Sequence, residues 1–224
     1  MEKKYRLLEN DTITVNGKTL YRIEALKDFA DVKKGDKGGY VEKGENLSHE
    51  GNCWVYDKAR VYGGAHVYGD ACVFDNAQVY GNARVYDNAR VAGRVCVASN
   101  TLVYGNARVY DNALVYGNAR VFDNAWVTGN ARFFGDARVY GEAHVTDDAR
   151  VYSDACIADN ALVCGNARVH GNARVHGEAH VTDDARVYGD ACIADNALVC
   201  GNARVHGNAR VHGNARIDGK TRTI

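Results

Sequence analysis

The histidines and cysteines are the residues whose chemistry could form a site, and most of them recur in copies 36 residues apart. The copies are His170/His206, His176/His212, His144/His180, Cys156/Cys192 and Cys164/Cys200. If two copies lie two layers apart, about 9.6 Å at strand spacing, they are too far apart to share a metal ion or form a disulfide. His176 and His180 flank one corner, where a neighbouring subunit would have to supply a third ligand. We therefore expect no metal site, no catalytic residue and no cofactor.

A six-residue period positions all of these side chains. From Val55 to Ile217 every sixth residue is apolar, through 28 successive hexapeptides without insertion or deletion. In a unit such as Ala-Arg-Val-Tyr, Ala and Val lie on one side of a short strand, and Arg and Tyr lie on the other. The next pair, such as Gly-Asn or Asp-Asn, tolerates the tight backbone angles of a corner. Because so short a strand is stable only when stacked on others, the pattern predicts a β-solenoid.

A longer repeat indicates how many hexapeptides form one coil. Residues 144–179 match residues 180–215 except at Ser153/Gly189 and Glu178/Asn214. An offset of 36 residues (144 to 180) is two coils of 18, so each coil would hold three hexapeptides. The outward side chains then fall on three faces.

The uninterrupted hexapeptides, with an aliphatic residue and a small residue four positions later, resemble the left-handed parallel β-helices of many acyltransferases and γ-class carbonic anhydrases. The resemblance covers residues 53–223 and implies an all-β fold of about nine left-handed coils, which in relatives commonly assembles into parallel trimers. The N-terminal part resembles the YdcK-like hexapeptide-repeat proteins of bacteria and their phages. The matching residues are Asp28-Phe29, Asp31-Val32, Gly38-Gly39-Tyr40-Val41, Asn46-Leu47-Ser48 and Gly51-Asn52-Cys53-Trp54. This likeness suggests a prophage-linked protein.

Residues 1–48 do not follow the repeat and are expected to form a small cap, with the solenoid over residues 49–224. Ile13–Val15 and Thr19–Ala25 flank Asn16-Gly17, which predicts a β-hairpin. A hairpin here would cover the open strand edge of the first coil. At the other end, residues 216–224 follow the last coil without a second cap. We expect that charged side chains alone protect this strand edge from pairing, or that the edge meets another chain end to end.

The first face is predicted to mediate self-association, because it carries few arginines and several apolar side chains. Its interface residues would be Trp54, Trp126, Leu162, Cys164, Leu198 and Cys200. The protein is accordingly expected to be a homo-oligomer, either a trimer or an end-to-end dimer.

The second face stacks arginines, and the third face stacks aromatic rings. The arginine column is Arg132, Arg150, Arg168, Arg186 and Arg204, and the ring column is Tyr68, Tyr86, Tyr104, Phe122 and Tyr140. We expect the arginines to pair with corner aspartates such as Asp136, Asp154 and Asp190, although a column of this kind is also a possible anion-binding site. The rings are expected to stabilise the stack as a ladder.

Composition limits the possible partners and the compartment. With 28 basic and 28 acidic residues, there is no electrostatic reason to expect nucleic acid. No apolar stretch is long enough for a membrane span, and the start of the chain lacks a signal-peptide core. The seven cysteines lack paired spacing, which favours a reducing, cytoplasmic location.

The sequence therefore predicts a non-catalytic structural or interaction rod. Two alternatives remain open. One is an acetyl-CoA-type acyltransferase with a site between subunits, and the other is polyanion or nucleotide binding by the Arg and Tyr columns.

Overall fold

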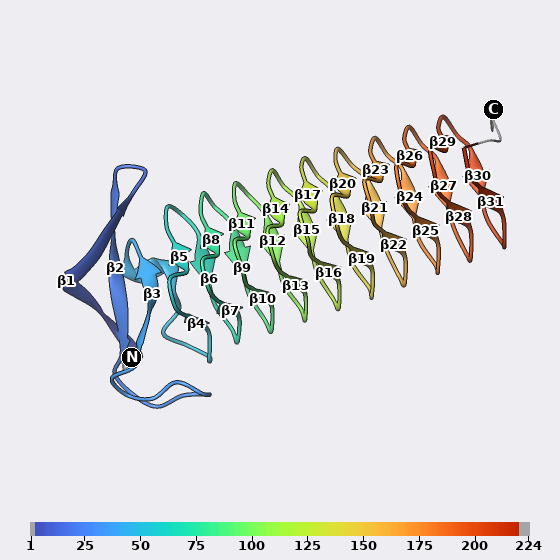
Figure 1. Ribbon diagram of the computed structural model, residues 1–224. Coiled ribbons are helices and arrows are strands. Elements are labelled where there is room, and N and C mark those ends of the chain that lie inside the picture. Colours follow the sequence, from blue (N-terminus) through green and yellow to red (C-terminus); the bar gives the residue numbers. More distant parts are fainter. Residues whose placement is uncertain (1–2, 220–224) are drawn as a thin grey trace.

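The computed structural model describes residues 3–219, which form a β-rod with a small N-terminal subdomain (Figure 1). The subdomain contains β1 (Tyr5–Val15), β2 (Lys18–Ala25), β3 (Lys37–Val41) and a single 3₁₀ turn, η1 (Gly44–Asn46). The rod consists of two-residue strands at six-residue intervals, beginning with β4 (Trp54–Val55), β5 (Arg60–Val61) and β6 (His66–Val67) and ending with β31 (Arg216–Ile217). No helix within residues 3–219 is long and apolar enough to cross a membrane.

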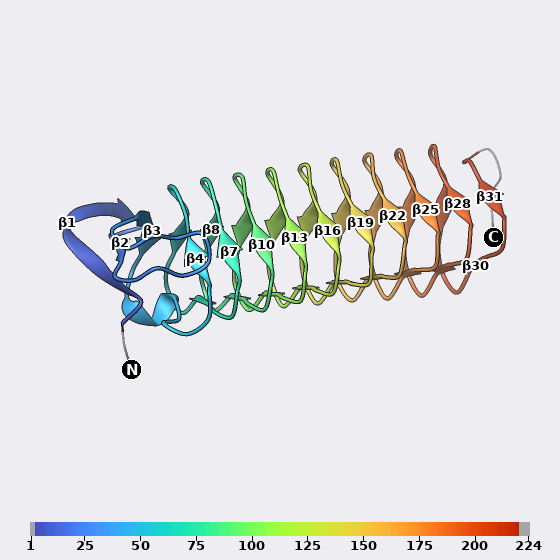
Figure 2. The same ribbon diagram turned by 90° about the horizontal axis from the view of Figure 1, so that it is seen from below.

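The short strands form three parallel sheets, one along each side of the rod (Figures 1 and 2). Each strand pairs with the third strand after it, so that residue i lies beside residue i+18, as Arg90 lies beside Arg108. The sheets running from β4, β5 and β6 are the predicted first, second and third faces, respectively. The coils wind in the left-handed sense. The expected left-handed parallel β-helix with three hexapeptides per coil is therefore confirmed.

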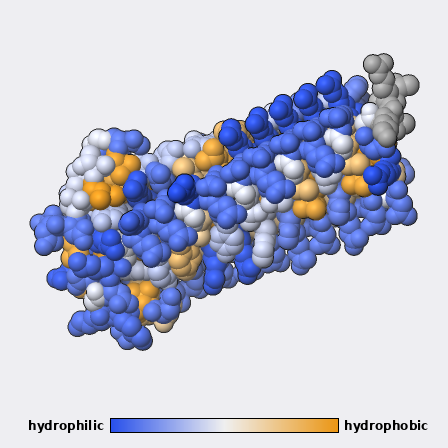
Figure 3. Space-filling model, viewed as in Figure 1, coloured by the Kyte–Doolittle hydropathy of each residue, from blue (hydrophilic) through white to orange (hydrophobic). Residues whose placement is uncertain are grey.

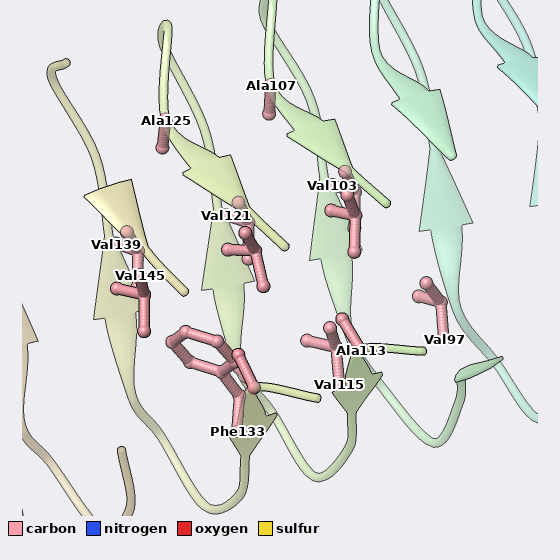
Figure 4. Packing of buried hydrophobic residues seen from close by; sticks show 14 of the residues in the cluster. Val97, Val103, Ala107, Ala113, Val115, Val121, Ala125, Phe133, Val139 and Val145 are labelled. Atoms are coloured by element: carbon pink, nitrogen blue, oxygen red, sulfur yellow. The ribbon is translucent and has the colours of Figure 1, made fainter. Parts of the chain in front are cut away.

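The core is a column of small and branched side chains inside the coils (Figure 4). The repeated Val and Ala residues are buried, and Phe133 fills the interior where other coils have Val. Thr101 replaces an inward Ala and is also buried, since its hydroxyl donates to the carbonyl oxygens of Ala98 (2.6 Å) and Val115 (3.3 Å). The face of the molecule shown in Figure 3 is mostly hydrophilic, with scattered apolar patches.

At two of the three corners of the coil, Asp and Gly alternate from one coil to the next. The aspartates and the glycines at these positions all have positive φ. The Asp111 carboxylate accepts a hydrogen bond from the Gly129 N–H at 2.9 Å, and Asp147 does the same for Gly165 at 3.0 Å. A Cβ at Gly129 would lie 2.7 Å from the Asp147 nitrogen, which favours glycine opposite that aspartate, although Asp57 and Asp75 stack in successive coils at the N-terminal end of the same corner. This alternation has a period of two coils, which is the length of the 36-residue sequence repeat.

The N-terminal hairpin is present, with Asn16 (φ 51°) and Gly17 (φ 75°) at its turn. The strand β2 pairs antiparallel with β3, and β3 pairs parallel with β5, so the hairpin covers the open edge of the second-face sheet. Leu47 also bridges to Val67 in parallel, which places part of the cap segment in the coil stack. At the opposite end, the predicted charged edge lies partly in residues 220–224, outside the described residues.

Candidate functional site

The first face differs from the prediction at Trp54, which is 1% exposed and therefore cannot contribute to a surface interface. Phe29 contacts its indole edge-on, with ring centroids 5.3 Å apart, and Tyr5 lies 6.1 Å away. The segment between β2 and β3 folds back over the first coil and brings Phe29 there, held by a bridge to Val32. Cys200, near the far end, is also buried, at 7% exposed.

The other proposed interface residues remain on the surface. Trp126 is 37% exposed, although Arg108 lies 4.8 Å over its ring and His144 stacks on it at 5.3 Å. Leu162 and Leu198 are half-buried on either side of exposed His180, and Cys164 is half-buried beside them. Self-association through this face stays a prediction.

The second face stacks its five arginines in register, but not with the expected counterions. The ion pairs within residues 3–219 include none of these arginines. Two of the corner aspartates are instead bound across coils by amides, since Asn118 donates to Asp136 and Asn172 donates to Asp190, each at 2.9 Å. The expected Arg–Asp pairing is therefore wrong for this face.

The third face begins as the predicted aromatic ladder. The rings of Tyr68, Tyr86, Tyr104, Phe122 and Tyr140 stack with centroids 4.8–4.9 Å apart and planes within 10° of parallel. The spacing equals the distance between neighbouring strands, so each ring rests on the next. The ladder prediction is confirmed.

The ladder ends after Tyr140, because Ala158 and Ala194 occupy every second ring position from there. The neighbouring outward column alternates in the same way, between arginine and cysteine. Its residues lie in register, in the order Arg138, Cys156, Arg174, Cys192 and Arg210. They begin the strands β18 (Arg138–Val139), β21 (Cys156–Ile157), β24 (Arg174–Val175), β27 (Cys192–Ile193) and β30 (Arg210–Val211). A coil with short side chains between two coils with long ones leaves a hollow. Within residues 3–219 this occurs over Ala158 and over Ala194, one copy in each half of the 36-residue repeat.

The first hollow, about 760 Å³, lies over Cys156 and Ala158 between the levels of Arg138 and Arg174. The Cys156 thiol donates to the Tyr140 hydroxyl at 3.6 Å. The neighbouring Cys156 sulfur, together with burial, raises the pKa of Tyr140 to about 12. The lining of this hollow includes the carboxylates of Asp154, Asp159 and Asp190. These carboxylates outnumber the two guanidinium groups, those of Arg138 and Arg174.

The second hollow, about 370 Å³, lies over Cys192 and Ala194 between the levels of Arg174 and Arg210. The carboxylate in its lining belongs to Asp190, and the imidazoles of His176 and His212 form part of its wall. Here guanidinium groups outnumber carboxylates two to one. The Cys192 Sγ lies 3.3 Å from His176 Nε2.

Behind His176, the Asp159 carboxylate lies 3.9 Å from Nδ1 and accepts a hydrogen bond from the Gly177 N–H at 3.0 Å. The three side chains come from three successive coils and form a Cys–His–Asp series. Sequence reasoning treated these cysteines only as distant copies. The available signal was the alternation of Arg with Cys, and of a ring with Ala, at a spacing of 18 residues.

A further hollow of about 840 Å³ lies where the cap meets the third face, lined in part by His49, His66, Tyr68 and Arg84. Burial lowers the pKa of both histidines, and nearby Lys4 and Arg84 lower it further for His49 and His66, respectively. No group of three His, Cys, Asp or Glu side chains suited to a metal ion occurs in residues 3–219.

Comparison with known proteins agrees with this architecture. The model of the YdcK β-solenoid repeat matches residues 77–96, 103–117, 113–129, 161–177 and 197–213. The matched segments all lie in the hexapeptide rod, so this part of the chain is similar to the YdcK β-solenoid repeat. A 63-residue stretch is 38% identical to the uncharacterized acetyltransferase YdcK of Escherichia coli K12, covering 25% of this chain and 19% of that protein.

Two solved structures are similar to the chain at low identity. LpxA from Acinetobacter baumannii is 12% identical with a TM-score of 0.37, covering 67% of each chain. The UDP-N-acetylglucosamine acyltransferase of Francisella novicida is 15% identical with a TM-score of 0.35, covering 62% of each chain.

Proposed function

We propose that this β-helix is a binding protein whose second hollow holds a small anionic ligand between Arg174 and Arg210. The observation that carries the proposal is the pair of arginines, which lie on either side of Cys192 in the strand register. Neither arginine has an ion pair among the described residues. Their levels are two coils apart, about 9.6 Å at strand spacing, so both guanidinium groups can reach one ligand.

The chemistry of the hollow favours phosphate or carboxylate groups. Guanidinium binds both with two parallel hydrogen bonds, and unpaired arginines carry no competing partner that a ligand must displace. A volume of about 370 Å³ fits a small molecule rather than a polymer. This assignment keeps the interaction role expected from the sequence and moves the anion site from the second face to the third.

Calorimetric titration with inorganic pyrophosphate tests the proposal. We expect binding that weakens with added salt and is lost in the double variant Arg174→Gln/Arg210→Gln. The matched control is Arg150→Gln/Arg168→Gln, which removes two stacked arginines from the second face. Unchanged binding in the third-face variant, or loss of binding only in the second-face variant, would refute the assignment.

Acyl transfer is the second candidate, favoured by the name of the E. coli relative and by an imidazole in the wall of the hollow. A general base beside a bound acyl donor could deprotonate an acceptor. This candidate predicts thermal stabilisation by acetyl-CoA and release of free CoA when an acceptor amine or hydroxyl is supplied. No stabilisation at millimolar acetyl-CoA would leave the non-catalytic function.

A further inference from the structure

The two hollows place a cysteine in nearly identical surroundings, but only one thiol faces a base. Cys156 and Cys192 occupy equivalent positions between stacked arginines, and both are half-buried. Cys156 meets the hydroxyl of Tyr140, whereas Cys192 meets the imidazole of His176. A tyrosine with a pKa of about 12 stays protonated at neutral pH and cannot take the thiol proton. A neutral imidazole nitrogen can.

The Asp159 carboxylate lies 3.9 Å from Nδ1 of this imidazole, and its negative charge favours the tautomer with the proton on that nitrogen. In that tautomer the lone pair of Nε2 is available to the Cys192 sulfur, 3.3 Å away. A nucleophile, a base and a carboxylate near the base are the parts of an activated thiol.

We propose that Cys192 is a nucleophilic modification site that reacts with small anionic disulfides. In the reaction the thiol proton passes from Sγ to His176 Nε2 and the sulfur attacks one sulfur atom of the disulfide. The disulfide S–S bond breaks as the new S–S bond to Cys192 forms, and the departing thiolate takes the proton from His176. The disulfide is the oxidant, and a second thiol reverses the modification by the same exchange.

The preference for an anion comes from Arg174 and Arg210, which flank the Cys192 strand on both sides. This part of the inference rests on the proposed anion site, whereas the reactivity of the thiol does not. Other cysteines offer a contrast, since burial raises the pKa of the thiols of Cys53, Cys72 and Cys164.

Alkylation of the full-length protein, analysed by mass spectrometry, measures the reactivity of each thiol. Cleavage after arginine yields peptides 151–168 and 187–204, which differ in mass because Ser153 corresponds to Gly189, and fragmentation separates the two cysteines in each. With limiting iodoacetamide at neutral pH, Cys192 should react faster than Cys156, on the order of tenfold, because the Cys192 sulfur contacts an imidazole nitrogen whereas the Cys156 sulfur contacts a phenol hydroxyl.

A reciprocal exchange of the neighbouring residues provides matched variants. His176→Tyr should reduce the rate at Cys192 to that of Cys156, and Tyr140→His should raise the rate at Cys156. Both variants use residues that the same column already holds, and circular dichroism checks that each folds. Equal rates at the two cysteines, or rates that do not follow the exchange, would overturn the inference.

Charge selectivity is tested separately with iodoacetate, which is anionic, and with oxidised glutathione. We expect the alkylation rate with iodoacetate, relative to that with iodoacetamide, to be raised at Cys192. We also expect oxidised glutathione to form a mixed disulfide there. Arg174→Gln/Arg210→Gln should abolish this preference but leave the iodoacetamide rate intact. A wild-type protein whose Cys192 is reactive but shows no preference for the anionic reagent, or a double variant that keeps the preference, would refute the anion site alone. An unreactive Cys192 in a protein that still binds pyrophosphate would refute only the nucleophile.

Discussion

The buried ammonium group of Lys4 lies 3.3 Å from the thiol of Cys53 at the N-terminal end of the rod. The same Nζ donates to the carbonyl oxygens of Cys53 (2.9 Å) and Gly51 (3.1 Å). Burial lowers the pKa of Lys4 and raises that of Cys53. One side chain from the cap thus satisfies backbone acceptors that the start of the first coil leaves unpaired.

Replacing Lys4 should therefore loosen the cap. In Lys4→Met the carbonyl oxygens lose their donor, a loss that costs about 1–3 kcal/mol for a buried polar group. Hydrogen exchange along β1 and β2 should become faster, whereas the central coils should keep their protection. Lys3→Met is the control, since Lys3 is exposed, and an equal effect of the two substitutions would contradict this role for Lys4.

Acidic pH should destabilise the same region through His49. Its Nδ1 accepts a hydrogen bond from the Lys4 N–H at 3.2 Å, and its ring stacks on Tyr5 at 4.4 Å. Burial, followed by the charge of Lys4, lowers the pKa of His49 below 6.5, so the unfolded chain binds a proton more readily than the folded one. Stability should therefore fall as pH drops through and below about 6.5.

The measurement is the thermal midpoint at pH 7 and at pH 5. Burial also lowers the pKa of His66 and His170, so His49→Gln should reduce the pH dependence without removing it. The carboxylates with lowered pKa, Asp28 and Glu42, titrate below their ordinary values of 3.8 and 4.5, outside this window. A midpoint that is the same at both pH values would exclude the histidine effect.

The aromatic ladder should contribute stability that depends on ring contact rather than on the hydroxyl group. Tyr104 stacks between Tyr86 and Phe122, each 4.9 Å away, so Tyr104→Ala removes two pairs, worth about 0.5–1.5 kcal/mol each. Tyr104→Phe should have little effect, because Phe122 already serves in the same column. Urea denaturation followed by circular dichroism compares the variants, and equal losses in both would show that the hydroxyl carries the effect.

How much the sequence could predict depended on whether a feature repeats. The six-residue period placed the buried Val and Ala residues, and the 36-residue repeat added the three faces and the Tyr ladder, because every coil imposes the same geometry. It could not predict the burial of Trp54, because Phe29 reaches that ring from a segment outside the repeat. The predicted Arg–Asp pairing of the second face was wrong for a different reason. Cross-coil amides bind two of the corner carboxylates that the arginines were expected to bind.

The hollows were missed because they arise from differences between coils. Ala158 and Ala194 satisfy the hexapeptide pattern as well as a ring does, since the outward position is not constrained by packing. The longer side chains stacked above and below, such as Tyr140, His176 and Arg174, turn these small residues into concavities.

The Asp/Gly corner alternation predicts unequal costs for identical glycine substitutions. Gly129→Ala places a Cβ 2.7 Å from the Asp147 nitrogen, so the stack must shift, whereas a Cβ at Gly207 meets nothing within 4 Å. Both have positive φ (66° and 62°), so both carry the left-handed penalty of roughly 1 kcal/mol and only Gly129 adds the clash. Urea denaturation should show Gly129→Ala to be clearly the less stable, and equal stabilities would refute the steric explanation.

Self-association through the first face is the prediction that concerns the whole molecule. Trp126, half-buried Leu162 and half-buried Leu198 lie along one side, and burying them against a second copy would remove apolar area from water. Light scattering should give a mass that is a multiple of 24.4 kDa, threefold for a trimer. Trp126→Glu and Leu162→Glu should each reduce it to the monomer, because either places a carboxylate in the apolar contact. Arg132→Glu, on the second face, is the control and should leave the mass unchanged. A wild-type monomer would exclude the interface, and an oligomer that resists both substitutions would indicate contact through the ends of the rod instead.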